Sequence, residues 1–202
     1  MVSRCLDWVL SPTLSPFECG ALAGAGSLVF TGHSRNGKQA ELVGALDESF
    51  GAIVGSSPST PTSVSWRFAS GFLFGRAPGH DPTPWNRNDG KFAQCYEGFE
   101  DRNPIDAHGV LALIAPRPLL MAAAKNDLCT TVFAVEQSYK AALKAYRLLS
   151  AEEHFRTSLR PDKHIGWIQV ERYLDWFDIA LHRSSCLELE RRFPQKMLYY
   201  FS

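Results

Sequence analysis

The sequence of 202 residues lacks a net charge, because 21 Lys and Arg residues balance 21 Asp and Glu residues. Proteins that bind polyanions usually carry a basic excess, so the overall charge does not indicate a nucleic-acid partner. No apolar run approaches the roughly 18 residues of a membrane-spanning helix. The segment that starts at Met1 also lacks the apolar stretch of a signal peptide. We therefore expect neither a nucleic-acid nor a membrane partner, and the compartment stays open.

Cysteine and histidine are scarce and do not have metal-ligand spacing. The cysteines are Cys5, Cys19, Cys95, Cys129 and Cys186, and no two of them form a C-x-x-C pair. This excludes a zinc ribbon and a dithiol redox motif, and leaves free, partly buried thiols as the simplest reading. The histidines also show no paired ligand spacing, as at His33, His80, His108 and His164. The sequence predicts no metal site and no cofactor.

Apolar residues are abundant enough for a packed core, at 45% against 21% charged residues. The length fits one domain or part of a larger one. Short apolar runs predict strands at 27–31, 52–55, 118–124 and 154–159, and spacings of three and four predict helices at 38–46, 108–114, 131–149 and 167–181. Thr131 is the candidate N-cap of the third of these helices. Because strands and helices alternate, we expect an α/β fold with a parallel four-stranded sheet.

Three segments fall outside this alternation. Residues 56–105 contain six prolines and many aromatic residues, which favours a packed cap that faces a substrate; packing without a functional role is the alternative. Residues 3–10 look like the end of a helix, and residues 183–202 look like a tail. We expect the α/β domain to occupy residues 1–182.

Three chemically distinct side chains follow three of the expected strands. Ser34 comes after the first, Asp127 after the third and His164 after the fourth. The carboxyl ends of parallel strands meet at one edge of a sheet, so these residues should lie together. The order serine, acid, histidine is that of the α/β-hydrolases. Each residue alone could be an ordinary loop residue, and the turn is G-x-S-x-x-G instead of the strict G-x-S-x-G.

This set of side chains suits nucleophilic catalysis at neutral pH. A serine hydroxyl needs a base, and imidazole is suitable because its ordinary pKa is about 6.5. A carboxylate behind the imidazole fixes its tautomer and stabilises its charged form. Gly32 and Gly37 would allow the tight strand–turn–helix that presents the hydroxyl.

The segment around this serine, T-G-H-S-R-N-G-K at residues 31–38, resembles the nucleophile motif of glucuronoyl esterases. These carbohydrate esterases cleave 4-O-methyl-glucuronate esters that link xylan to lignin. Residues 105–118 resemble the segment before the acid strand in that family, and residues 160–166 and 173–178 resemble its histidine loop and last helix. The resemblance spans about residues 3–182 and implies an α/β-hydrolase fold.

The resemblance also implies roles for individual residues. Ser34 would be the nucleophile and His164 the general base. Arg35 would help to hold the oxyanion, and Lys38, one helical turn after Ser34, would contact sugar hydroxyls or the uronate. The alternative for Lys38 is a solvated helix residue.

The sequence departs from the family at three places. Fungal members carry the acid in a Gln-Glu-Ser segment where this chain has residues 55–58, G-S-S-P. Asp127, the position that many bacterial relatives use, is the remaining acid. A tryptophan that those relatives carry beyond the acid is replaced near Leu128 and Cys129. Ile165 follows His164 where relatives often have a second histidine.

Only four strands are expected, whereas a complete α/β-hydrolase sheet has about eight. The sequence therefore resembles the C-terminal half of such a domain, without the early loop that normally supplies a second oxyanion N–H. We expect a serine carboxylic-ester hydrolase that acts on uronate or carbohydrate esters. The alternatives are an impaired remnant with a binding role or none, and a general acyl esterase or peptidase of the same fold. The oligomeric state stays open.

Overall fold

The computed structural model describes residues 28–68, 100–127, 129–164, 170–181 and 191–193. Its main elements are β1 (Leu28–His33), α2 (Arg35–Leu46), β2 (Phe50–Ser56), α5 (Ala107–Ala112), β3 (Leu119–Ala124), α6 (Val132–Leu148), β4 (Phe155–Arg160) and α7 (Val170–Ala180). Three short 3₁₀ helices are η2 (Trp66–Phe68), η3 (Glu100–Arg102) and η4 (Glu152–His154). No helix in these ranges is both long and apolar enough to cross a membrane.

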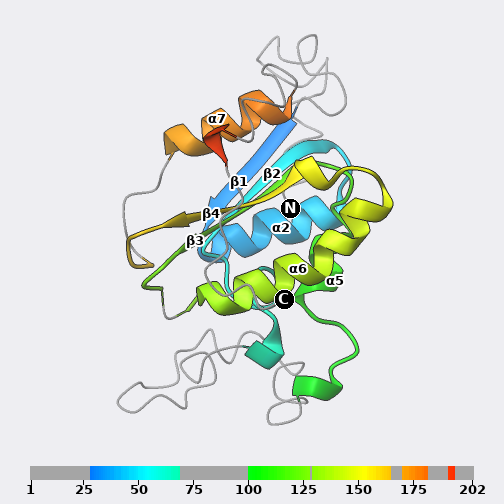
Figure 1. The fold of residues 1–202 in the computed structure, drawn as a ribbon, viewed down its shortest axis with the longest axis vertical. Coiled ribbons are helices and arrows are strands. Elements are labelled where there is room, and N and C mark those ends of the chain that lie inside the picture. Colours follow the sequence, from blue (N-terminus) through cyan, green and yellow to red (C-terminus); the bar gives the residue numbers. More distant parts are fainter. Residues whose placement is uncertain (1–27, 69–99, 128, 165–169, 182–190, 194–202) are drawn as a thin grey trace, which may run out of the picture.

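The four strands form one sheet in the order β1-β2-β3-β4, and every neighbouring pair is parallel. Helices α2, α5 and α6 cover one face of the sheet, and α7 covers the other (Figure 1). The α/β class and the four parallel strands predicted from the sequence are confirmed. The carboxyl ends of all four strands lie at the same edge, which is where the three candidate side chains follow.

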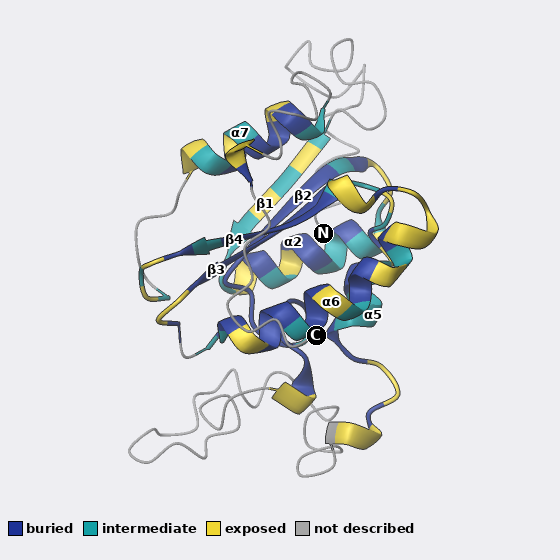
Figure 2. Ribbon diagram, viewed as in Figure 1, coloured by how far each residue is buried: buried dark blue, intermediate teal, exposed yellow. Residues whose placement is uncertain are grey.

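Burial explains why the strands differ in sequence. All six residues of β3 are buried, as expected for a strand with helices on both faces. In β1 exposed residues alternate with half-buried ones, and Val29 is 37% exposed. Figure 2 shows this contrast between β1 and the inner strands. In the part of the chain that the structure describes, β1 pairs only with β2 and forms an edge of the sheet.

Two apolar clusters hold the layers together. The larger lies between the sheet and the helices α2, α5 and α6, and includes Phe155 stacked on Tyr146 with ring centroids 4.6 Å apart. The smaller lies under α7, where Trp176 meets Phe193 edge to face at 5.4 Å. Phe193, which belongs to the expected tail, is 1% exposed and packs on the core.

The start of α2 differs from the sequence prediction. Helix α2 begins at Arg35, three residues before the expected start, because Ser34 already turns the chain into the helix. Thr131 occupies the N-cap position of α6, as predicted, although its hydroxyl makes no capping hydrogen bond. Within the expected helix 167–181, Val170 and Leu174 have the spacing of core residues, but they are 54% and 57% exposed. Helix α7 instead contacts the sheet through Tyr173, Trp176 and Phe177.

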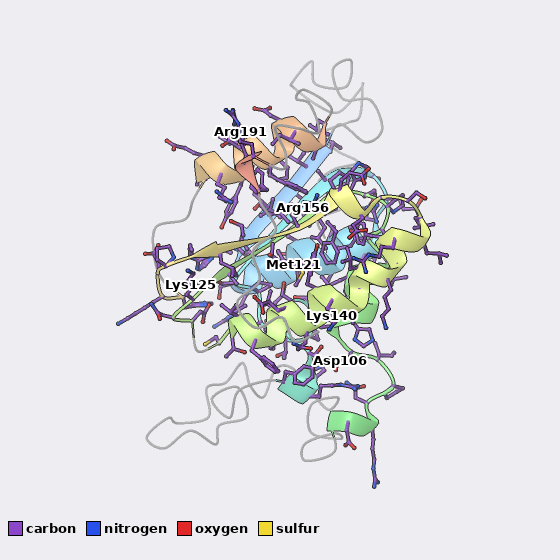
Figure 3. The ribbon with its side chains drawn as sticks, in the orientation of Figure 1. Asp106, Met121, Lys125, Lys140, Arg156 and Arg191 are labelled. Atoms are coloured by element: carbon purple, nitrogen blue, oxygen red, sulfur yellow. The ribbon has the colours of Figure 1, made fainter. Side chains whose placement is uncertain are left out.

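The expected cap at 56–105 lies largely outside the described residues, but both of its ends are described. Asp106, labelled in Figure 3, ties them together. Its Oδ1 accepts from the backbone N–H groups of Trp66 and Ala107, both at 2.8 Å, and its Oδ2 accepts from Arg67 Nε at 3.0 Å. Asp106 thus also caps α5. The expected helix 3–10 and the remainder of the tail lie outside the described residues.

Glu41 is a fully buried carboxyl group on the inner face of α2. Ser63 Oγ donates to its Oε1 at 2.6 Å, whereas Oε2 has no partner in the described residues. The side chain fills the space left by Gly55, where an added Cβ would collide with it. Burial raises the pKa of Glu41 to about 7, and the hydrogen bond from Ser63 opposes the rise.

We expect Glu41 to make stability decrease as the pH rises from about 4.5 to about 7. Below this window the carboxyl is protonated in the folded and unfolded chains alike. Within it only the unfolded chain ionises, and above it the loss is constant at about 3 kcal/mol. Glu41→Gln should remove this decrease. Urea unfolding at pH 4.5 and pH 8 measures the difference, with the exposed Glu48→Gln as control. Equal pH dependence in Glu41→Gln and wild type would contradict the assignment.

Candidate active site

Ser34 lies at the sharp turn between β1 and α2. Its backbone has φ 58° and ψ −120°, a conformation that non-glycine residues rarely adopt. The backbone N–H of Ser34 donates to the carbonyl of Ser56 at 2.8 Å, which ties the turn to the end of β2. A strained serine between a strand and a helix is the geometry of the hydrolase nucleophile elbow.

The glycines of the turn are required by close backbone approach. A Cβ on Gly37 would lie 2.8 Å from the carbonyl oxygen of Ser56 and 3.1 Å from that of Gly32. A Cβ on Gly32 would collide with the carbonyl of Asn36. Both neighbours are backbone atoms that cannot move independently. The spacing G-x-S-x-x-G is therefore the spacing that this turn needs.

Asp127 follows β3, and its side chain is fully buried. Its Oδ1 accepts from the backbone N–H of Cys129 at 2.8 Å and of Thr130 at 3.1 Å. Its Oδ2 lies 2.8 Å from His164 Nδ1. Burial would raise the pKa of Asp127, but the hydrogen bond and charge of His164, together with donors from Cys129 and Ser57, lower it overall. The carboxylate is thus ionised at neutral pH and oriented on both oxygens.

His164 lies between this carboxylate and the serine. Its Nε2 is 2.9 Å from Ser34 Oγ, on the side opposite the contact with Asp127. A carboxylate only accepts, so Nδ1 carries the proton and Nε2 is the acceptor for the serine hydroxyl. The His164 side chain is 23% exposed, so the imidazole is reachable from solvent while its acid partner is not.

A second group of polar side chains lies behind the histidine, at the ends of β1, β2 and β4. Ser56 Oγ is 3.0 Å from His33 Nδ1 and accepts from Tyr173 Oη at 2.8 Å. Arg160 is 3% exposed and donates to Ser57 Oγ at 2.8 Å and to the carbonyl of His164 at 3.2 Å. Ser56 and Ser57, at the end of β2, thus both accept from a buried guanidinium.

Asp127, Cys129 and His164 also place one metal-ligand atom each within 4.8 Å of one another. Burial, followed by the negative charge of Asp127, raises the pKa of the Cys129 thiol to about 11, and Lys38 opposes the rise. The thiol is therefore protonated at neutral pH. Both carboxylate oxygens and both ring nitrogens already have hydrogen-bond partners. The arrangement suits an acid–base relay better than a metal centre.

Comparison with known proteins agrees with this geometry. The model of the family "Glucuronyl esterase, fungi" matches residues 24–150, which is more than half of the chain. The chain belongs to the glucuronyl esterase family. These proteins are carbohydrate esterases with an α/β fold, as the sequence motifs predicted. No curated protein matches the chain.

Solved glucuronoyl esterases share the fold. The catalytic domain from Hypocrea jecorina is 24% identical with a TM-score of 0.66, and the chain covers 51% of it with 91% of its own length. The enzyme from Caldicellulosiruptor kristjansonii is 22% identical with a TM-score of 0.63, and the match covers 46% of that enzyme and 86% of this chain. A promiscuous esterase from a marine bacterial metagenome is 21% identical with a TM-score of 0.67, and the match covers 46% of that esterase and 89% of this chain. The chain spans about half the length of these glucuronoyl esterases.

The structure brings Ser34, His164 and Asp127 into a continuous hydrogen-bonded line. Arg35 is the exposed first residue of α2 directly after the serine, and Lys38 lies one turn further on, where its charge acts on the Cys129 thiol. Sequence reasoning gave no role to the polar group behind the histidine, which includes His33 and Arg160. Their positions at the carboxyl ends of the expected strands were the available signal.

Proposed function

We propose that the chain carries a serine esterase site in which Ser34 is the nucleophile, His164 the general base and Asp127 the acid that orients it. The observation that carries the proposal is the relay of 2.9 Å from Ser34 Oγ to His164 Nε2 and 2.8 Å from His164 Nδ1 to Asp127 Oδ2. Membership of a carbohydrate esterase family supports an ester as the substrate.

The first half of the reaction forms an acyl-enzyme. Ser34 Oγ attacks the ester carbonyl carbon while His164 Nε2 takes the hydroxyl proton, and Asp127 stabilises the imidazolium that results. The tetrahedral intermediate then expels the alcohol, which leaves with the proton from His164. In the second half His164 takes a proton from water, and the resulting attack releases the acid and restores the serine.

The negative oxygen of the intermediate needs hydrogen-bond donors next to Ser34. The backbone N–H of Arg35, at the start of the 12-residue helix α2, is suited to this task, and its guanidinium supplies further positive charge. Lys38, on the same helix, is placed to contact the hydroxyls of a sugar or the uronate group. We assign Arg35 to oxyanion stabilisation and Lys38 to substrate binding.

We propose uronate esters of carbohydrates as the substrate class. The test compares hydrolysis of methyl 4-O-methyl-glucuronate with hydrolysis of p-nitrophenyl acetate and butyrate by the purified chain. We expect turnover of the uronate ester at a higher kcat/KM than that of the short acyl esters. Turnover of the acyl esters alone would overturn the uronate assignment in favour of a general acyl esterase. If the chain turns over none of these esters, the esterase proposal is overturned and the impaired remnant is favoured.

A further inference from the structure

Arg160, the last residue of β4, is a buried cation among neutral acceptors. Besides Ser57 Oγ at 2.8 Å and the His164 carbonyl at 3.2 Å, it reaches Ser56 Oγ at 3.4 Å and the Lys163 carbonyl at 3.5 Å. In the described ranges no carboxylate forms a salt bridge with it. A guanidinium held by neutral acceptors can only donate to them, so it fixes the direction of each of these hydrogen bonds.

The first consequence is the direction of the proton at Ser57. A guanidinium only donates, so the Ser57 hydroxyl oxygen must accept from Arg160. The hydroxyl proton of Ser57 is then left for another acceptor, and the Ser57 hydroxyl lowers the pKa of the Asp127 carboxyl, as a donor directed toward it would. These directions agree with a chain from Arg160 through Ser57 and Asp127 to His164, in which the Arg160–Ser57 and Asp127–His164 contacts are both 2.8 Å.

The second consequence concerns the contacts of His164 with Arg160 and His33. Tyr173 donates to Ser56, which leaves the Ser56 proton for His33 Nδ1 at 3.0 Å. His33 therefore carries its ring proton on Nε2, and its ring centroid lies 5.2 Å from that of His164. Burial, followed by the charges of His164 and Arg160, lowers the pKa of His33 and keeps its ring neutral. The His164 carbonyl thus receives a donor from Arg160 at 3.2 Å, with the neutral His33 ring packed beside the His164 ring.

We propose that Arg160 is a positioning residue for the general base, assisted by His33: it holds the His164 carbonyl and, through Ser57, fixes the Asp127 carboxylate as the acceptor for His164. This inference rests on the proposed triad. It also explains why a pair of serines is suitable at the end of β2, because each hydroxyl can accept hydrogen bonds and still donate its own proton onward.

The kinetic test measures the rate constant for labelling Ser34 with a fluorophosphonate. Arg160→Met should lower it by about 100-fold, since a displaced base misaligns the attacking hydroxyl. Ser57→Ala, which leaves Arg160 in place, should lower it by about 10-fold.

The matched control is Arg156→Met. Arg156 is a buried arginine at the start of the same strand, 6% exposed, and it donates to the carbonyls of Glu152 and Phe155 at 2.8 and 3.1 Å. Figure 3 shows it at the opposite end of the sheet from Lys125, whose backbone N–H donates to the Arg160 carbonyl at 2.8 Å. We expect the labelling rate of Arg156→Met to stay within about twofold of that of the wild type. Equal rates in Arg160→Met and Arg156→Met would overturn the inference.

A spectroscopic readout separates positioning from folding. In ¹⁵N-histidine-labelled protein, the Nδ1 proton of His164 should resonate far downfield in wild type and Ser34→Ala, and should move upfield in Arg160→Met and Ser57→Ala. His33 should show the neutral Nε2–H tautomer. If the wild-type chain shows these histidine signals but takes up no label, the proposed function is overturned and the positioning role is not. An unchanged His164 signal in both Arg160→Met and Ser57→Ala would overturn the positioning role.

Discussion

Ser34→Ala is expected to lower kcat for uronate ester hydrolysis on the order of 10⁵- to 10⁶-fold without unfolding the protein. In the proposed mechanism the hydroxyl oxygen of Ser34 forms the bond to the ester carbon, and no other nucleophile is hydrogen-bonded to His164 in the described site. The backbone turn is held by the N–H of Ser34 and not by its hydroxyl, so alanine should retain the elbow. The measurement is steady-state hydrolysis alongside thermal unfolding.

The matched control for this variant is Ser49→Ala. Ser49 is an exposed serine in the loop between α2 and β2, and it is held by its backbone N–H. The activity of Ser49→Ala should equal that of the wild type. A Ser34→Ala enzyme that retained more than about one hundredth of the wild-type kcat would show that the ester is cleaved by another group.

Asp127→Asn is expected to lower kcat by about 10⁴-fold. The amide oxygen can still accept from the backbone N–H groups of Cys129 and Thr130, so the loop should keep its shape. The amide nitrogen then faces His164 Nδ1 as a donor, and the imidazole must adopt the tautomer with its proton on Nε2. That tautomer cannot accept the Ser34 proton.

This prediction is checked by kinetics together with histidine NMR. The exposed Asp101→Asn is the control, and it should behave as wild type. The Asn variant should show His164 protonated on Nε2 at neutral pH. Wild-type activity in Asp127→Asn would mean that another acid orients the histidine.

The elements and the three central side chains could be predicted from the sequence because each has a local signal. The apolar run at 118–124 predicts a strand buried on both faces, and β3 is one. The glycines around Ser34 predict a tight turn, and residues that follow parallel strands must share an edge. The order of Ser34, Asp127 and His164 along the chain then suffices to place them together.

The support behind the histidine could not be predicted, because it depends on register and on partners far apart in sequence. Arg160 meets Ser57 only because β4 aligns with β3 and β3 with β2 in the observed register. Val170 and Leu174 have the helical spacing of core residues, but the rotation of α7 about its axis, set by Tyr173 and Trp176, exposes them. A candidate cap such as Thr131 likewise predicts a helix start without fixing which donor its hydroxyl meets.

The central claim is that Ser34 is a nucleophile activated by His164 and Asp127. Its most direct test is to react the wild-type chain with a fluorophosphonate and map the adduct by peptide mass spectrometry. The account predicts one adduct per chain, on Ser34, at a rate that falls sharply in His164→Gln. An adduct on a different serine, or a folded chain that takes up no label, would contradict it.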